Sequence, residues 1–90
     1  MDKMKFQEMM ELNAVNQLTM GDVLPLMNSD DWFERLCGEY FELQMRIGKL
    51  MNFLDSRVIE ANENLLVIQL SAMNTYASIL EARIVKEFNK

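Results

Sequence analysis

The 90-residue sequence contains no histidine, one cysteine, one proline and three glycines. Without histidine, the chain lacks the commonest general base and the commonest metal ligand. No glycine-rich phosphate loop is present, and the acidic pairs at helical spacing, such as Glu39/Glu42 and Glu60/Glu63, are typical of a solvated helix face. We therefore expect a protein that is not an enzyme and that holds no cofactor and no metal.

The cysteine count and the net charge of the chain indicate its cellular compartment and the classes of partner it can bind. Cys37 is the single cysteine and cannot form an internal disulfide, which is typical of a reducing cytoplasm. The net charge of −5 disfavours general nucleic-acid binding, because phosphate backbones repel an acidic chain. No continuous apolar run approaches the length of a membrane span, and the start of the chain lacks the apolar core of a signal peptide. We expect a cytoplasmic protein with no membrane partner.

Few turn formers and half of the residues apolar favour long helices, so we predict an all-α fold. Periodicity predicts a first helix over Lys3–Leu18. Thr19 and Asp22 then resemble a weak capping box, and Pro25 is tolerated only in the first turn of a helix, so residues 19–29 are expected to be a connector with one helical turn at most. The predicted units are residues 1–28, a short N-terminal helix with its connector, and residues 29–90.

A second helix is predicted from Ser29, a good N-cap, to the region of Asp55–Arg57. Its large apolar residues recur at alternating spacings of three and four, which is the pattern of one helix lying along another. Those residues are Phe33, Leu36, Tyr40, Leu43, Ile47, Leu50 and Leu54. Gly38 and Gly48 interrupt good helix formers and predict close approach of a neighbouring backbone.

A third helix is predicted to reach nearly to Lys90, after a turn between Asp55 and Asn64. One apolar stripe pairs it with the second helix in a long antiparallel hairpin. This stripe consists of Leu66, Leu70, Met73, Ala77, Leu80, Ile84 and Phe88. A further apolar set, Leu65, Ile68, Ala72, Tyr76, Ile79 and Val85, widens the face beyond what one partner helix covers. We expect the N-terminal helix to cover one part of this face and a second copy of the chain to cover the other, which predicts a homo-oligomer that forms a helical bundle.

The basic residues of the second helix allow two interpretations. Arg35, Arg46 and Arg57 recur every eleven residues, which places them on one flank, with Lys49 close by. Because Arg35–Glu39 and Glu42–Arg46 are i, i+4 pairs, the flank is explained by solvated ion pairs. The alternative is that symmetry gathers basic residues of several copies into a pocket for a small anionic nucleotide. The candidate ligand-binding residues are Arg35, Arg46, Lys49, Tyr76 and Arg83.

Nine methionines suit either an irregular core or an adaptable binding surface, because thioether side chains are flexible. In the surface interpretation, the candidate partner-binding residues are Phe6, Met9, Met10 and Trp32. In the core interpretation, Trp32 caps the end of the core. Cys37 is expected to be buried apolar filler.

The second and third helices resemble an uncharacterised family of small phage helical-hairpin proteins related to crAss-like phages. The resemblance lies in "ELQMRIGKLMNFL" (residues 42–54) and "LLVIQLSAMNTYASILEARI" (residues 65–84), and it covers roughly residues 34–87. The step "QLSAM" is also similar to the hairpin domain of the anti-CBASS and anti-Thoeris sponges of phages, which sequester nucleotide signals. The resemblance implies a phage protein in the cytoplasm of an infected bacterial host, and it implies no functional residues.

Three functions remain open. The first is an accessory protein that counters a bacterial anti-phage defence by stoichiometric sequestration of a small nucleotide signal. The second is a direct protein–protein inhibitor of a host defence effector, for example a CRISPR component. The third is a structural adaptor in phage assembly.

Overall fold

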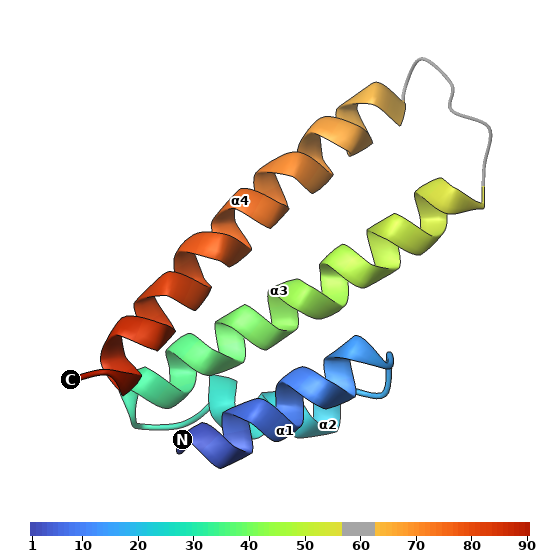
Figure 1. Cartoon of the computed structure of the whole chain (residues 1–90). Helices are drawn as coiled ribbons and strands as arrows, with labels where there is room; N and C mark the ends of the chain where they lie inside the picture. Colours follow the sequence, from blue (N-terminus) through green and yellow to red (C-terminus); the bar gives the residue numbers. More distant parts are fainter. Residues whose placement is uncertain (57–62) are drawn as a thin grey trace.

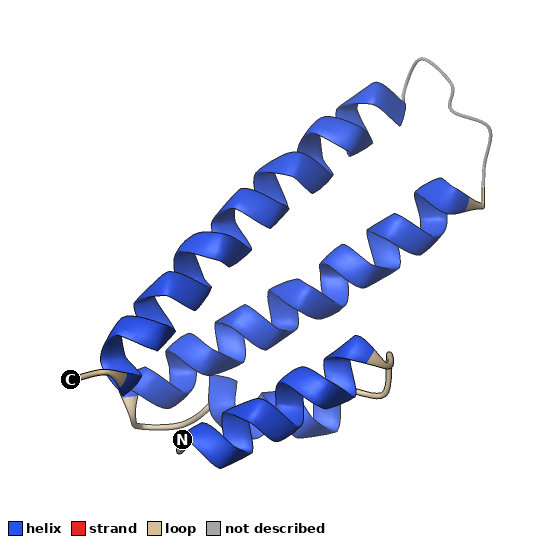
Figure 2. Cartoon of the chain, in the orientation of Figure 1, coloured by secondary structure: helices blue, strands red, loops and turns tan. Residues whose placement is uncertain are grey.

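The computed structural model describes residues 1–56 and 63–90, and these residues form four helices and no strand (Figures 1 and 2). The helices are α1 (Lys3–Ala14), α2 (Met20–Met27), α3 (Trp32–Asp55) and α4 (Glu63–Phe88). The prediction of an all-α fold is confirmed. The turn predicted between Asp55 and Asn64 falls mostly outside the described residues.

The first helix ends four residues before the predicted end at Leu18. At its end, Asn16 adopts a left-handed φ of 58°, which asparagine tolerates better than most residues. The Gln17 N–H donates to the Leu12 carbonyl at 2.8 Å, and the Asn16 N–H donates to the Asn13 carbonyl at 3.1 Å. These two bonds form a Schellman motif that stops the helix. Leu18 is nevertheless buried beyond the turn.

The predicted connector contains a complete second helix, so the expectation of one turn at most was wrong. Thr19 Oγ1 accepts from the Asp22 N–H at 3.3 Å, and Asp22 Oδ2 accepts from the Thr19 N–H at 2.9 Å. This reciprocal capping box satisfies two donors of the first turn. Pro25 is the sixth residue of α2, beyond the predicted first turn. The helix tolerates it because the carbonyl that loses its partner belongs to Gly21, which is exposed and accessible to water.

The start of α3 is capped by Asp31 and not by Ser29, which corrects the predicted N-cap. Asp31 Oδ1 accepts from the Phe33 N–H at 3.1 Å. Ser29 supports this cap from outside the helix, because its hydroxyl accepts from the Asp31 N–H at 3.1 Å and donates to Glu34 Oε1 at 2.7 Å. Several capping residues in succession thus act as one polar cluster at the helix start.

The two long helices lie side by side and run in opposite directions (Figure 1). Helix α2 packs on α3, and α1 lies along α3 with Phe6 reaching Phe88 near the end of α4. Gly38 permits the close packing of α2 on α3, because an added Cβ would lie 2.8 Å from the Met27 backbone nitrogen. Gly48 does not have this role, since an added Cβ would meet nothing within 4 Å. The prediction of close approach is therefore confirmed at Gly38 and wrong at Gly48.

The core lies along α3, around the predicted stripe. Phe6 of α1 contacts the rings of Tyr40, Phe41 and Phe88 at centroid distances of 6.0, 5.2 and 5.6 Å. The predicted stripe of α4 supplies three buried residues, Ala77, Leu80 and Ile84. The wider set that the sequence assigned to further partners is exposed throughout.

The outward side of α4 is unusually apolar for an exposed helix. Leu65, Ile68 and Ile79 are 72%, 63% and 52% exposed. Within the described residues, Asn64–Phe88 is the one stretch that is long and apolar enough to cross a membrane by length and composition, and only 11% of its most apolar window is buried. One such helix is weak support for a span, but it shows that α4 is not satisfied by α3 alone.

Candidate functional site

The five predicted ligand-binding residues do not meet in one pocket of this chain. Arg35 Nη1 donates to the Ser29 carbonyl at 2.8 Å, and Arg46 Nε lies 2.9 Å from Glu42 Oε1. The predicted Glu42–Arg46 ion pair is thus present. The predicted Arg35–Glu39 pair does not form, because Arg35 caps the turn before α3.

Glu39 instead accepts from Tyr76 of α4. The Tyr76 hydroxyl lies 2.6 and 3.1 Å from the two carboxylate oxygens. This hydrogen bond raises the pKa of Tyr76, and the nearby Arg83 guanidinium opposes the increase. A carboxylate thus occupies the centre of the Tyr76–Arg83 cluster, which disfavours an anionic ligand at this place.

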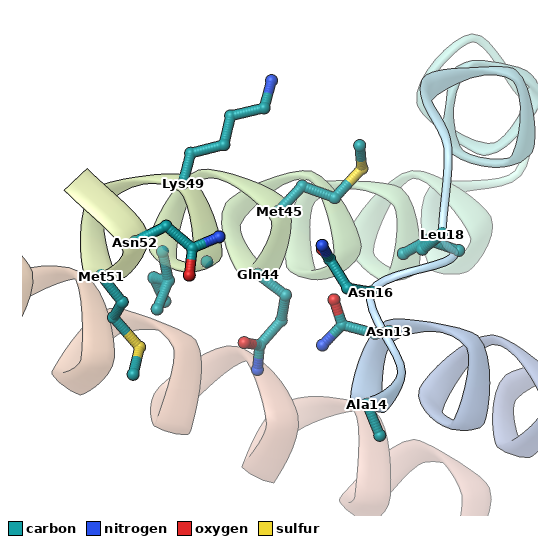
Figure 3. Close-up of a pocket in the computed structure, with 11 residues that line it drawn as sticks. Asn13, Ala14, Asn16, Leu18, Gln44, Met45, Lys49, Met51 and Asn52 are labelled. Carbon is teal, nitrogen blue, oxygen red and sulfur yellow. The ribbon is translucent and has the colours of Figure 1, made fainter. Parts of the chain in front are cut away.

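Of the predicted ligand residues, Lys49 lines a cavity in the described part of the chain. This cavity, the amide pocket, has a volume of about 460 Å³ and lies between the end of α1 and the second half of α3 (Figure 3). Its lining is formed by Asn13, Ala14, Asn16, Leu18, Gln44, Met45, Ile47, Gly48, Lys49, Met51 and Asn52. The volume falls within the range of about 300–1,000 Å³ that is usual for small-molecule sites.

Four carboxamides gather in the amide pocket. Asn13 and Asn16 come from the end of α1, and Gln44 and Asn52 come from α3 (Figure 3). Asn16 has a left-handed conformation at the turn after α1, and it lines the cavity together with Asn13 and residues of α3. Each carboxamide offers both a donor and an acceptor, so the group can pair with the hydrogen-bonding edge of a base or another amide.

One of these amides is fixed by the core. Gln44 Nε2 donates to the Tyr40 hydroxyl at 2.9 Å, and the Tyr40 hydroxyl donates to Met10 Sδ at 3.6 Å. Burial raises the pKa of Tyr40, which keeps this hydroxyl protonated. The chain from Met10 to Gln44 therefore orients one wall of the amide pocket.

Lys49 carries the only charge among the residues that line the amide pocket. Its side chain extends from α3 with the ammonium pointing away from the four carboxamides (Figure 3). No ion pair engages Lys49 in the part of the chain that the structure describes. In a protein of net charge −5, this leaves a local positive site beside neutral hydrogen-bonding groups.

The predicted partner-binding residues divide between core and surface. Phe6 and Met9 are buried and Met10 is half-buried, so these residues serve the core and Phe6 and Met9 are not available to a partner. Trp32 is 51% exposed, with its ring edge-on to Phe33 at 5.8 Å. Of the four predicted partner-binding residues, Trp32 is the most exposed and Met10 is partly accessible.

Cys37 is fully buried, which confirms its prediction as apolar filler. Burial raises the pKa of the thiol to about 11, so the nucleophilic thiolate is not populated at neutral pH. Among the residues outside 57–62, no three His, Cys, Asp or Glu side chains are grouped to hold a metal ion.

The carboxamides of the amide pocket were not predicted from the sequence. Gln44, Gly48 and Asn52 recur every four residues and mark one flank of α3, but this spacing alone does not distinguish a site from a solvated flank. The position of the α1 end across from that flank depends on the turn at Asn16 and on the packing of α1, which periodicity does not describe.

Comparison with known protein families assigns the chain to one of them. The model of the Sequestin family matches residues 30–86, which is more than half of the sequence and includes nearly all of α3 and α4. The chain belongs to the Sequestin family. No curated protein and no solved structure matches it.

The family name indicates a small protein that acts by sequestering a partner. The matched region contains Gln44, Lys49 and Asn52 of the amide pocket, whereas Asn13 and Asn16 lie before it. The wall that α3 provides is therefore part of the family region, and the wall that α1 provides is outside it.

Proposed function

We propose that this protein is a phage-encoded, non-enzymatic binding protein that counters a bacterial anti-phage defence by sequestering a small nucleotide signal in the cytoplasm of the infected host. In this proposal α3 and α4 act as an antiparallel hairpin, and the amide pocket is the ligand site. The observation that carries the proposal is that Lys49 and four carboxamides line one cavity.

The two kinds of group match the two parts of a nucleotide. The Lys49 ammonium supplies a positive charge for a phosphate, and asparagine and glutamine side chains pair with the edges of bases. Met45 and Met51 offer polarizable apolar surface for the flat face of a base. Stoichiometric binding needs no catalytic group, which agrees with the family name.

The direct test is titration calorimetry of the purified protein with a panel of cyclic di- and trinucleotides. We expect at least one nucleotide to bind, and we expect Lys49→Ala to weaken it by about tenfold or more, since a charge-assisted hydrogen bond is lost. Arg46→Ala is the matched control, because Arg46 lies one turn away on α3 and is paired with Glu42. The absence of heat with every nucleotide would exclude the proposal.

In cells, the protein should restore plaques in bacterial strains that carry a nucleotide-signalling defence system. Lys49→Ala should lose this effect and Arg46→Ala should keep it. Restoration of plaques by both variants would show that the amide pocket is not the site that counters the defence.

The exposure of Trp32 favours a second candidate, a direct protein–protein inhibitor of a defence effector. Tryptophan is enriched among residues that dominate binding energy at protein interfaces, and Trp32 is 51% exposed. This candidate predicts that Trp32→Ala abolishes protection while nucleotide binding is absent in the wild-type protein. A Trp32→Ala variant that protects as well as the wild type would exclude it.

A further inference from the structure

Helix α4 carries two heptad stripes on opposite sides. The first stripe faces α3 and includes the buried residues Ala77, Leu80 and Ile84. A second stripe, the outer seam, consists of Leu65, Ile68, Ala72, Thr75, Ile79 and Ala82. Its spacings of 3, 4, 3, 4 and 3 residues place it about 150° around the helix from the first.

Every residue of the outer seam is exposed. In the described part of the chain no helix packs on this side, because α2 packs on α3 and α1 meets α4 at Phe88, which belongs to the first stripe. A heptad stripe is the pattern of a helix that packs along another helix. We propose that the outer seam binds the outer seam of a second copy of this chain, with the two α4 helices antiparallel about a two-fold axis.

The order of residue sizes along the outer seam is what identifies a second copy as the occupant. A two-fold axis that passes between residues 73 and 74 pairs Leu65 with Ala82, Ile68 with Ile79 and Ala72 with Thr75 of the other copy. Large residues thus meet small ones at the ends, and small residues meet at the centre, where the helices can approach closely. These are also the a-to-d layers that an antiparallel pair requires.

The polar groups on this side do not oppose burial. The Thr75 hydroxyl already donates to the Ser71 carbonyl at 3.1 Å, so its hydrogen bond survives contact with another helix. A parallel pair would instead place Lys86, which continues the same spacing, beside its own copy at a cost in like-charge repulsion.

A lipid bilayer fits this helix less well than a second copy does. Glu81 and Arg83 lie within the apolar stretch Asn64–Phe88, where burial in hydrocarbon is costly. At the surface of a helix pair, both of these side chains remain in water.

The size of the outer seam sets the expected affinity. Eighteen helical residues extend about 27 Å, and a contact about 10 Å wide covers on the order of 300 Å² in projection. This is smaller than the roughly 800 Å² per partner of a standard interface, so we expect a dimer that dissociates in the micromolar range.

The first experiment is sedimentation velocity without nucleotide, from about 1 to about 200 µM protein, the range over which a micromolar dimer forms. The wild type should convert from monomer to dimer. Ile79→Glu should stay monomeric at every concentration, with unchanged helical circular dichroism because Ile79 is 52% exposed. Val67→Glu is the matched control and should dimerise like the wild type, since Val67 is an exposed apolar residue of α4 outside the outer seam.

The second experiment tests direction and register. Ile68→Lys and Ile79→Glu should each be monomeric alone, but an equimolar mixture should form a heterodimer, because the antiparallel register places the new lysine opposite the new glutamate. A mixture of Ile79→Lys and Ile79→Glu would form a heterodimer only if the helices were parallel.

Three results would overturn the proposal. They are a wild-type monomer at the highest concentration, formation of the heterodimer by the parallel mixture instead of the antiparallel one, and binding of a monomeric wild type to anionic phospholipid vesicles. Because no nucleotide is present, failure of this proposal is distinguishable from failure of the proposed function.

Discussion

Helices α3 and α4 have similar lengths and pack on one another, yet their surroundings differ. In α3 seven residues are buried, from Leu36 to Ile47. Among residues 64–88 of α4, the buried ones are Ala77, Leu80 and Ile84, although α4 is the more apolar of the two helices. The difference shows that the packing of α1 and α2 on one side of α3 leaves α4 with a single covered face. Apolar surface in excess of what the fold covers marks a place for a partner.

The largest expected effect on stability separates a buried residue of α3 from an exposed residue of α4. Phe41 of α3 is fully buried against Phe6 and Tyr40, so Phe41→Ala should lower the free energy of unfolding by about 3–5 kcal/mol. Ile79→Ala on α4 removes an exposed side chain and should cost less than about 0.5 kcal/mol in the monomer. Urea unfolding at low protein concentration, followed by circular dichroism, measures both.

Equal losses for these two variants would contradict the comparison, because they would mean that the outward side of α4 is covered within one chain. The total free energy of unfolding of a domain is usually about 5–15 kcal/mol, so the loss expected for Phe41→Ala is a large share of it. Complete loss of helical signal in Phe41→Ala agrees with the expected result.

An intermediate effect should separate the two glycines of α3. Gly38→Ala places a methyl group 2.8 Å from the Met27 backbone nitrogen and should cost about 1–3 kcal/mol through overpacking against α2. Gly48→Ala meets nothing within 4 Å and should stabilise the protein by about 0.5–1 kcal/mol through better helix propensity. Thermal unfolding of the two variants should therefore shift in opposite directions. Destabilisation by both would show that the Gly48 side of α3 is also closely packed.

The smallest effect concerns the hydrogen bond that joins the exposed flanks of α3 and α4. The Glu39 carboxylate raises the pKa of Tyr76, so Glu39→Gln should lower that pKa toward its ordinary value. Because the folded-state pKa is raised, the stabilisation from this bond is present below the ordinary tyrosine pKa and is lost as the pH rises through the raised value. Ultraviolet titration of phenolate in a Tyr40→Phe background isolates Tyr76. An unchanged titration curve after Glu39→Gln would contradict the contact.

Much of the architecture follows from local pattern. The stripe from Leu36 to Ile47 predicted which side of α3 is buried, and Ala77, Leu80 and Ile84 did the same for α4, because helical periodicity fixes which residues share a face. The sequence also indicated that α3 alone does not cover Leu65, Ile68 and Ile79, since one partner helix covers only one stripe, but the expected cover by the N-terminal helix is wrong, because these residues are exposed.

The helix ends and the site were less predictable. Ser29, Asp30 and Asp31 can all cap a helix, so their sequence does not decide which of them accepts from the first turn. The amide pocket depends on the left-handed turn at Asn16, which brings the end of α1 across from Gln44. Such a contact between residues far apart in the sequence is set by tertiary packing, which helical spacing does not predict.

The account depends most directly on whether the outer side of α4 is covered by another molecule in solution. A thiol introduced by Ile79→Cys reports this through its rate of alkylation by iodoacetamide, followed by mass spectrometry, and Cys37 stays silent because it is buried with a pKa raised to about 11. The account predicts alkylation that slows by about fivefold or more when the protein concentration rises from the monomer to the dimer range, while Val67→Cys reacts equally at both. An alkylation rate of the Ile79→Cys variant that does not change with protein concentration would contradict it.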